Sequence, residues 1–129
     1  MRIIGHGIDL VEIARVRKLV CEHGQRFLDR CFTPAEQAYC AANPKRYFQH
    51  LCGRFAAKEA ILKVLGTGWR NGIAWTDMEI TNNRAGQPQV ALHGECARLA
   101  AEMGINAWLI SISHIETHAT ASAIGLATN

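Results

Sequence analysis

One long helix near the middle of the sequence restricts most strongly what the rest of the chain can fold into. The segment from 47 to 65, YFQHLCGRFAAKEAILKVL, has apolar residues at the three- and four-residue steps of a buried helical stripe, and the glycines of Gly66-Thr67-Gly68 end it. Glu59 falls inside that stripe, between Phe55 and Leu62. A carboxylate on an apolar face is unfavourable unless it is paired or coordinates a metal. The sequence therefore predicts a helix whose buried face carries a carboxylate that needs a partner.

The segments on either side of this helix predict a mixture of strands and shorter helices. Thr33-Pro34-Ala35-Glu36 has the features of a capping box, with Pro34 at the first helical position, and the helix it starts should stop at Asn43-Pro44. The other expected elements are a strand over 2–11, a helix from 13 that ends at Gly24, a hairpin of strands 76–81 and 88–93, a helix over 95–103 closed by Gly104, and an antiparallel pair over 107–115 and 118–127. This order predicts an α+β fold, with an antiparallel sheet against the long central helix, in a single domain over residues 1–129.

Composition and charge exclude several functional classes. The five cysteines include no CxxC pair, which argues against a zinc ribbon and a disulfide framework and favours reduced thiols packed as small hydrophobes. No apolar run approaches the roughly 18 residues that span a bilayer, and the N-terminus has no secretory pattern, so we expect a cytoplasmic protein with no membrane partner. Residues 1–63 hold 11 Lys and Arg against 6 Asp and Glu. This basic first half indicates an acidic or phosphate-bearing partner, but no basic run or known motif indicates nucleic acid.

Two carboxylates on apolar segments are the first candidates for chemistry. Glu59 could form an ordinary helical ion pair with Lys63, four residues later. Asp9 lies in GIDLV and could equally be a cap or a turn residue, although Gly5 and Gly7 before it permit close backbone approach. Together, Asp9 and Glu59 suit a hard cation such as Mg²⁺, which commonly uses one or two carboxylates and takes substrate phosphates and water as its other ligands. Lys63 would then face the same phosphates.

Two further segments have competing interpretations. GTGWRNG (66–72) is either a simple helix cap and loop or a turn whose free backbone N–H groups bind an anion, and it lacks the Walker pattern. SISHIETH (111–118) places serines near His114, but no nucleophile elbow supports a Ser–His hydrolase. His114 and His118 have a spacing seen in zinc sites, yet we expect them at a strand end and turn rather than on one helix face. His114 is thus either a plain surface or core residue, or a residue for phosphate contact or proton transfer.

Four separated segments resemble holo-acyl-carrier-protein synthase, the small single-domain type of 4′-phosphopantetheinyl transferase. They are GIDLVEIAR (7–15), GRFAAKEAILKVLGTG (53–68), MEI with GQP (78–88), and SISH with ATASAI (111–124). The resemblance covers essentially the whole chain, and the G-x-D and F-x-x-K-E-A segments together are highly specific. It implies transfer of phosphopantetheine from coenzyme A to a serine of an apo acyl carrier protein in fatty acid biosynthesis, with release of adenosine 3′,5′-bisphosphate.

The resemblance also implies roles for individual residues. Asp9 and Glu59 match the Mg²⁺ ligands. On physical grounds, Glu59 or a metal-held water beside it is the candidate acceptor of the serine proton. The remaining matches are Lys63 near the pyrophosphate, Arg54 with Gly66 and Gly68 in the coenzyme A surroundings, His114 near the nucleotide phosphates, and Arg15 and Arg26 against the acidic carrier protein. The family implies a homotrimer with active sites at subunit interfaces. Glu59, Lys63 and His114 are therefore the expected catalytic residues.

Two positions depart from the family pattern. His6 stands where an aliphatic residue is usual, and we expect it to lie near Asp9 and add a pH response. Trp69 replaces a smaller aliphatic residue after the glycine turn and is expected to reshape the nucleotide side of the pocket. The alternative from another functional class is a module that binds coenzyme A or a carrier protein without catalysis. That module would suit a chain lacking Asp9, Glu59 or Lys63, and all three are present.

Overall fold

The computed structural model describes residues 1–70 and 72–129, and its elements follow the predicted order. The helices are α1 (Ile13–His23), α2 (Gln25–Cys31), α3 (Pro34–Ala41), α4 (Tyr47–Leu65) and α5 (Gly94–Glu102), with short 3-10 turns η1 (Pro44–Arg46) and η2 (Trp75–Asp77). The strands are β1 (Arg2–Glu12), β2 (Met78–Asn82), β3 (Pro88–Leu92), β4 (Ala107–His114) and β5 (His118–Ala127). The predicted α+β class is confirmed, and the α2 helix is an element that the sequence reading did not identify.

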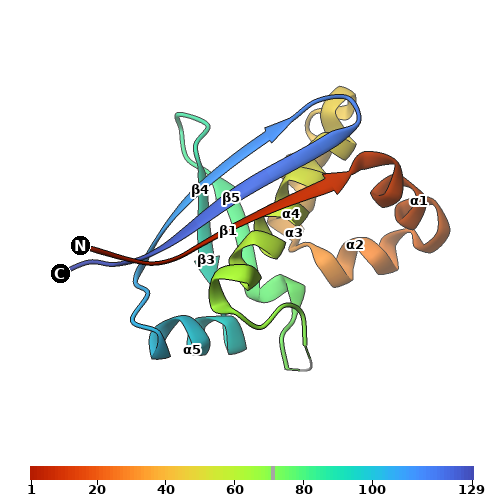
Figure 1. Ribbon diagram of the computed structural model, residues 1–129. Coiled ribbons are helices and arrows are strands. Elements are labelled where there is room, and N and C mark those ends of the chain that lie inside the picture. The colour runs from red at the N-terminus through yellow and green to blue at the C-terminus, as the bar shows by residue number, and fades with distance from the viewer. Residues whose placement is uncertain (71) are drawn as a thin grey trace.

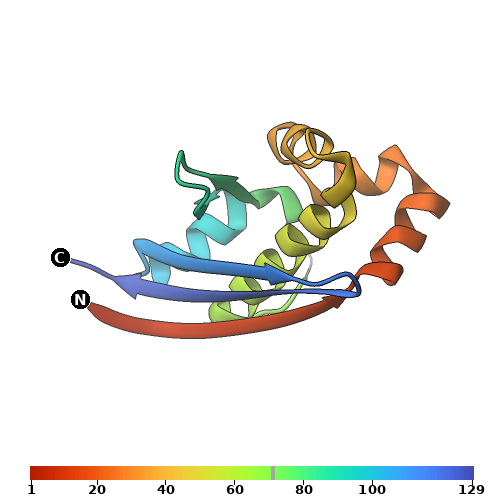
Figure 2. The same ribbon diagram turned by 90° about the horizontal axis from the view of Figure 1, so that it is seen from above.

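The strands form two antiparallel sheets. The larger has the order β1-β5-β4, and the smaller is the β2–β3 hairpin (Figure 1). Arg2 at the start of β1 pairs with Ala127 at the end of β5, so the chain termini lie side by side. In Figure 2 the helices and the hairpin lie on one side of the larger sheet. Exposed apolar side chains mark its other face, among them Ile8, Leu10 and Leu109.

Helix α4 is buried nearly all the way round, because β1 and β5 pack on it from one direction and α1, α3 and β2 from others. The predicted buried stripe is confirmed at Leu51, Cys52 and Leu62, but burial extends well beyond it around the helix. Phe55 and Glu59 are only half-buried and Lys63 is exposed. These three residues, each four positions after the last, form the side of the helix that is most exposed to solvent. The Glu59 carboxylate therefore needs no buried ion-pair partner, because it faces a hollow rather than the hydrophobic core.

Local signals place the shorter elements. Gly24 ends α1 with a positive φ of 55°, and Gly66 ends α4 in the left-handed conformation with φ 80°. Thr33 and Glu36 form the predicted capping box, in which the Thr33 side chain accepts from the Glu36 backbone N–H and the Glu36 side chain accepts from that of Thr33. In the part of the chain that the structure describes, no helix has the length and apolarity needed to cross a membrane.

Candidate active site

The two predicted carboxylates meet in a hollow of about 680 Å³ between β1, α1 and α4. Asp9 reaches it because Gly7 lets β1 lie against the helix: a Cβ on Gly7 would come within 2.1 Å of the Ala60 carbonyl oxygen. Burial raises the pKa of the Glu59 carboxyl, and the charge of Asp9 raises it further, while Lys63 and Arg15 act in the opposite direction. Two carboxylates whose charges repel, at the mouth of a hollow, form a donor set that suits a hard divalent cation.

Lys63 pairs with Asp9 rather than with Glu59. Its Nζ donates to the Ile8 carbonyl oxygen at 2.7 Å and to Asp9 Oδ1 at 3.2 Å. Among the described residues, no ion pair within 4.0 Å joins Lys63 to Glu59, so the simple helical pair considered from the sequence is not formed. The Lys63 side chain is half exposed, and its ammonium group is accessible beside the carboxylates. Gly66 and Gly68, both with positive φ, follow one turn beyond it.

Arg54 and His114 lie in a second, smaller hollow of about 210 Å³. Arg54 is only 3% exposed. It donates from Nη2 to Asn82 Oδ1 at 2.6 Å, and its guanidinium lies 4.0 Å from the centre of the Tyr39 ring. His114 ends β4 and is exposed, and its ring centre lies 6.2 Å from that of His50, a residue that the sequence reading missed. No carboxylate is among the described residues that line this hollow, so it is suited to an anion.

The two hollows lie on different flanks of α4. Glu59 and Arg54 are five residues apart, which turns their side chains about 140° from one another around the helix. Asp9 lies on β1 and His114 on β4, the two edge strands of the same sheet. One copy of the chain therefore does not bring together all of the predicted site residues.

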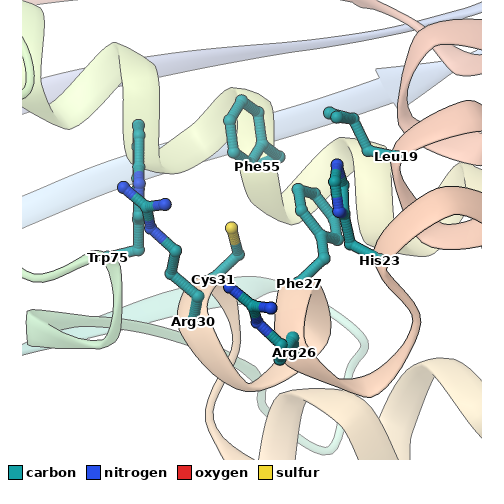
Figure 3. A pocket seen from close by; sticks show the side chains of 8 residues that line it. All are labelled: Leu19, His23, Arg26, Phe27, Arg30, Cys31, Phe55 and Trp75. Carbon is teal, nitrogen blue, oxygen red and sulfur yellow. The ribbon is translucent and has the colours of Figure 1, made fainter.

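A third hollow, of about 340 Å³, adjoins the carboxylate hollow, and Figure 3 shows the side chains that line this third hollow. Its basic residues are Arg26 and Arg30 of α2 and His23 of α1, and the two hollows share Leu19, Phe55 and Trp75. Burial raises the pKa of the Cys31 thiol in this hollow to about 11, which makes it a packing group rather than a nucleophile.

The two departures at His6 and Trp69 have local explanations. His6 lies three residues from Asp9 on β1, so the two side chains face opposite sides of the sheet, and the expectation that they lie close together is wrong. The His6 Nε2 lies 2.9 Å from Ser122 Oγ on the neighbouring strand. Trp69 stacks on Trp75 with ring centres 6.4 Å apart, and Arg30 lies over it. Trp69 thus packs against two residues, Trp75 and Arg30, that line the third hollow.

A buried ion pair beneath the site was also not predicted from the sequence. Lys58 and Glu36 are both fully buried, and Lys58 Nζ lies 2.6 Å from Glu36 Oε1. The same ammonium donates to the Cys31 carbonyl oxygen at 2.7 Å and to that of Trp75 at 3.2 Å. Glu36 Oε2 accepts from the Ile80 backbone N–H at 2.9 Å. The pair therefore joins α2, α3, α4, η2 and β2, and it holds the Trp75 wall in place.

Comparison with known proteins agrees with this geometry. A family described as the 4′-phosphopantetheinyl transferase superfamily matches residues 5–122. The chain belongs to this superfamily. It is 47% identical to the holo-[acyl-carrier-protein] synthase of Protochlamydia amoebophila over 94% of this chain and 96% of that protein. It is 42% identical to the synthase of Solibacter usitatus over 87% of this chain and 89% of that protein.

Solved structures of superfamily members have the same fold. The acyl carrier protein synthase of Plasmodium yoelii with ADP bound aligns with a TM-score of 0.87 and 32% identity, over 99% of this chain and 98% of that one. The Helicobacter pylori holo-[acyl-carrier-protein] synthase in complex with coenzyme A aligns with a TM-score of 0.82 and 30% identity, over 95% and 100%. The predicted phosphopantetheinyl transferase fold and enzyme class are confirmed.

Proposed function

We propose that this transferase moves the 4′-phosphopantetheine group of coenzyme A to a serine hydroxyl of an apo acyl carrier protein and releases adenosine 3′,5′-bisphosphate. The observation that carries the proposal is the meeting of Asp9 and Glu59 in one hollow, with Lys63 bonded to Asp9. This hollow adjoins a basic and apolar hollow large enough for a protein side chain. The coenzyme A complex of the Helicobacter pylori relative supports the same co-substrate. We place the reaction in fatty acid biosynthesis in the cytoplasm.

The chain's own residues supply charge and position for the displacement. The serine oxygen forms a bond to the phosphorus next to the pantetheine, and the bond from that phosphorus to the nucleotide phosphate breaks. Lys63, which is half exposed and donates to Asp9, would stabilise negative charge on the departing bisphosphate. Glu59, or a metal-held water beside it, is the group we assign to accept the serine proton, because Glu59 lines the hollow together with Asp9.

Asp9 and Glu59 are the residues that would hold Mg²⁺. Both carboxylates line the same hollow, and their mutual repulsion, which adds to burial in raising the pKa of Glu59, favours a cation between them. When bound, Mg²⁺ supplies neutralisation of pyrophosphate charge. Among the described residues there is no group of three or more His, Cys, Asp or Glu that could hold a metal, so substrate and water oxygens would complete the coordination.

A transfer assay tests the function directly. The protein is incubated with Mg²⁺, coenzyme A and apo carrier proteins of fatty-acid and polyketide types, and the carrier is weighed by mass spectrometry. We expect one phosphopantetheine to be added to a carrier, and EDTA to prevent the addition. Carriers that bind the protein but keep their mass would instead support the non-catalytic binding module and contradict the transferase proposal.

The carrier protein would dock on the third hollow and along α1. Arg15 lines the carboxylate hollow and Arg26 the third, so basic residues border the path toward Glu59. Phe27, Phe55 and Trp75 supply an apolar floor there (Figure 3). An acidic helix with one apolar side chain matches this combination in charge and polarity, and its serine would be delivered to the adjoining hollow.

Arg26→Gln should raise the KM for the carrier protein by about three- to tenfold with little change in kcat, because charges at the border of an interface mainly affect encounter. The dependence of kcat/KM on salt should also become weaker. Arg98→Gln is the matched control, since Arg98 lies on α5 and pairs with Glu102. Equal salt dependence in the wild type and Arg26→Gln would contradict the docking role.

We also propose that the active site is completed by a second copy of the chain, in a homotrimer. The carboxylates lie at the β1 edge and Arg54 with His114 at the β4 side, so a head-to-tail contact would bring one copy's nucleotide residues beside its neighbour's carboxylates. Such heterologous contacts close into rings. The uncovered sheet face with Ile8, Leu10 and Leu109 gives apolar surface for the assembly.

Mixing two inactive variants tests this shared site. Asp9→Asn and Arg54→Ala should each be inactive, but co-refolded in equal amounts they should recover about a quarter of wild-type activity, because about one interface in four then has two intact halves. Sedimentation of the wild type should give the mass of three chains. No recovery in the mixture, with trimers present, would show that each site belongs to one chain.

A further inference from the structure

Trp69, on the loop after α4, is the last of three aromatic rings that pack in a row. The rings of Phe55 and Trp75 have centres 4.9 Å apart, and the Trp69 ring stacks on Trp75 with centres 6.4 Å apart and planes 17° from parallel. Phe55 and Trp75, both drawn in Figure 3, line the carboxylate hollow as well as the third hollow. The row therefore begins one helical turn before Glu59 and ends at Trp69 on the surface.

The outer end of this row combines an exposed ring with positive charge. Trp69 is 44% exposed, and the Arg30 guanidinium lies over its ring, 5.7 Å from the ring centre. Arg30 and Arg26 line the third hollow, and no carboxylate is among the described residues that line it. Single exposed apolar side chains are common on protein surfaces. An exposed tryptophan that holds an arginine beside a hollow is instead the combination that contributes most at protein interfaces.

The loop places Trp69 near the third hollow rather than the second. Gly66 and Gly68 both have positive φ, 80° and 58°, so the chain turns sharply just before the tryptophan. Trp69 is not among the described residues that line the second hollow, where Arg54 and His114 lie. Its ring contacts are with η2 and α2. We therefore looked for its partner on the side of the molecule where the carrier protein would dock.

We propose that Trp69 is a specificity-determining residue for the carrier protein. It selects a carrier whose acidic helix places an apolar side chain on the Trp69 ring and a carboxylate beside Arg30. The inference rests on the proposed function, in which the carrier serine is delivered to Glu59. The two steps from Phe55 to Trp75 and on to Trp69 together match the width of a helix, roughly 10–12 Å with its side chains, so a helix docked at Glu59 also covers Trp69.

Preorganisation explains why the ring would add affinity. A tryptophan ring removes a large apolar area from water when it is covered, and Trp69 is already held against Trp75 in the free protein, so little side-chain entropy remains to be lost. The Arg30 guanidinium is likewise held over the ring before a carboxylate arrives. These contacts lie at the carrier and not at the reacting phosphorus. They therefore lower the KM for a matching carrier and leave kcat unchanged.

Steady-state transfer by the full-length protein tests this inference, with KM measured separately for the carrier protein and for coenzyme A. Trp69→Ile removes the ring but keeps an apolar side chain, and Trp69→Phe keeps a smaller ring against Trp75. Arg70→Gln is the matched control, because Arg70 is the next residue on the same loop but lies 3.8 Å from Glu95 of α5. The carrier is used as the wild type and in variants that shorten each apolar residue of its acidic helix to alanine.

Trp69→Ile should raise the KM for the carrier about tenfold, as loss of a central aromatic contact does at interfaces, with kcat and the KM for coenzyme A within about twofold. Trp69→Phe should raise the KM for the carrier less than about threefold, since a ring remains. Arg70→Gln should behave as the wild type.

The carrier variants separate a direct contact from a merely structural role. One alanine variant should lose about tenfold in kcat/KM with the wild-type enzyme but less than about threefold with Trp69→Ile, because two side chains in contact do not contribute independently. A tryptophan that only stabilised the loop would show no such coupling to a single carrier residue.

A higher KM for coenzyme A, with an unchanged KM for the carrier, would overturn the inference and assign Trp69 to the nucleotide, while the transfer function would stand. Unchanged or equally raised KM values for both substrates in Trp69→Ile would also overturn it, as would the absence of coupling to every carrier variant. A wild-type protein that transfers to none of the carriers would overturn the proposed function together with the inference.

Discussion

Glu59→Gln will reduce transfer of phosphopantetheine by about a thousandfold or more, the effect of losing several kcal/mol of charge stabilisation and a proton acceptor at once. The substitution keeps the shape of the side chain, so the hollow with Asp9 and Arg15 remains. The variant should unfold at the same temperature as the wild type or slightly higher, because burial and Asp9 both disfavour the charge that is removed. Activity is measured from the mass of the carrier protein, and stability by thermal unfolding.

The matched control for this variant is Glu102→Gln on α5, an exposed carboxylate that pairs with Arg98. It should transfer at the wild-type rate. Asp9→Asn should be as inactive as Glu59→Gln, since both carboxylates would hold the same cation. A Glu59→Gln protein that keeps more than about a tenth of wild-type activity would show that Glu59 is neither the metal ligand nor the proton acceptor.

Lys58→Met will lower the free energy of unfolding by about 3–5 kcal/mol, because removal of one member of a buried pair leaves the other charge without compensation. Glu36 would stay buried beside the vacated position, and the carbonyl oxygens of Cys31 and Trp75 would lose a donor. Urea unfolding followed by circular dichroism, at one protein concentration for all variants, measures the change. A loosened Trp75 wall should also raise the KM for the carrier protein.

Arg98→Met provides the comparison at the surface. Arg98 pairs with Glu102 at the exposed surface, and its substitution should lower the free energy of unfolding by less than about 1 kcal/mol. The double variant Lys58→Met/Glu36→Gln should lose less free energy of unfolding than the two single variants lose together, because the two side chains interact directly. If the free energy of unfolding of Lys58→Met lies within about 1 kcal/mol of that of the wild type, the buried pair does not have the stabilising role assigned to it.

Much of the fold was predictable because its signals are local. The capping box at Thr33, the glycine that ends α4 and the alternation in β4 and β5 each depend on residues a few positions apart. Helix α2 was missed because it is short and directly follows α1 at Gly24. The near-complete burial of α4 was also missed, since the number of elements that pack around a helix is not encoded in its own periodicity.

The candidate site was predicted unevenly for a similar reason. Asp9 and Glu59 were found because carboxylates on apolar segments are conspicuous, and Lys63 because it follows Glu59 by one helical turn. The structure brings the two carboxylates to one hollow and pairs Lys63 with Asp9. Their metal and catalytic roles stay predictions. Lys58 and Glu36 were overlooked because lysine beside glutamate in a helix, and glutamate in a capping box, both have ordinary surface explanations. His50 had no sequence signal at all, since an isolated histidine in a helix has many possible environments.

Sequence alone was therefore sufficient for the identity of the chemical groups, the order of the elements and the family, because these depend on residue type and short-range spacing. Folding was needed to pair Lys63 with Asp9 instead of Glu59, to turn His6 away from the carboxylates, and to put Arg54 and His114 on a different flank of α4. The physical reason is that pairing across elements depends on the strand register and on the helix rotation of about 100° per residue. These determine which side chains share a space.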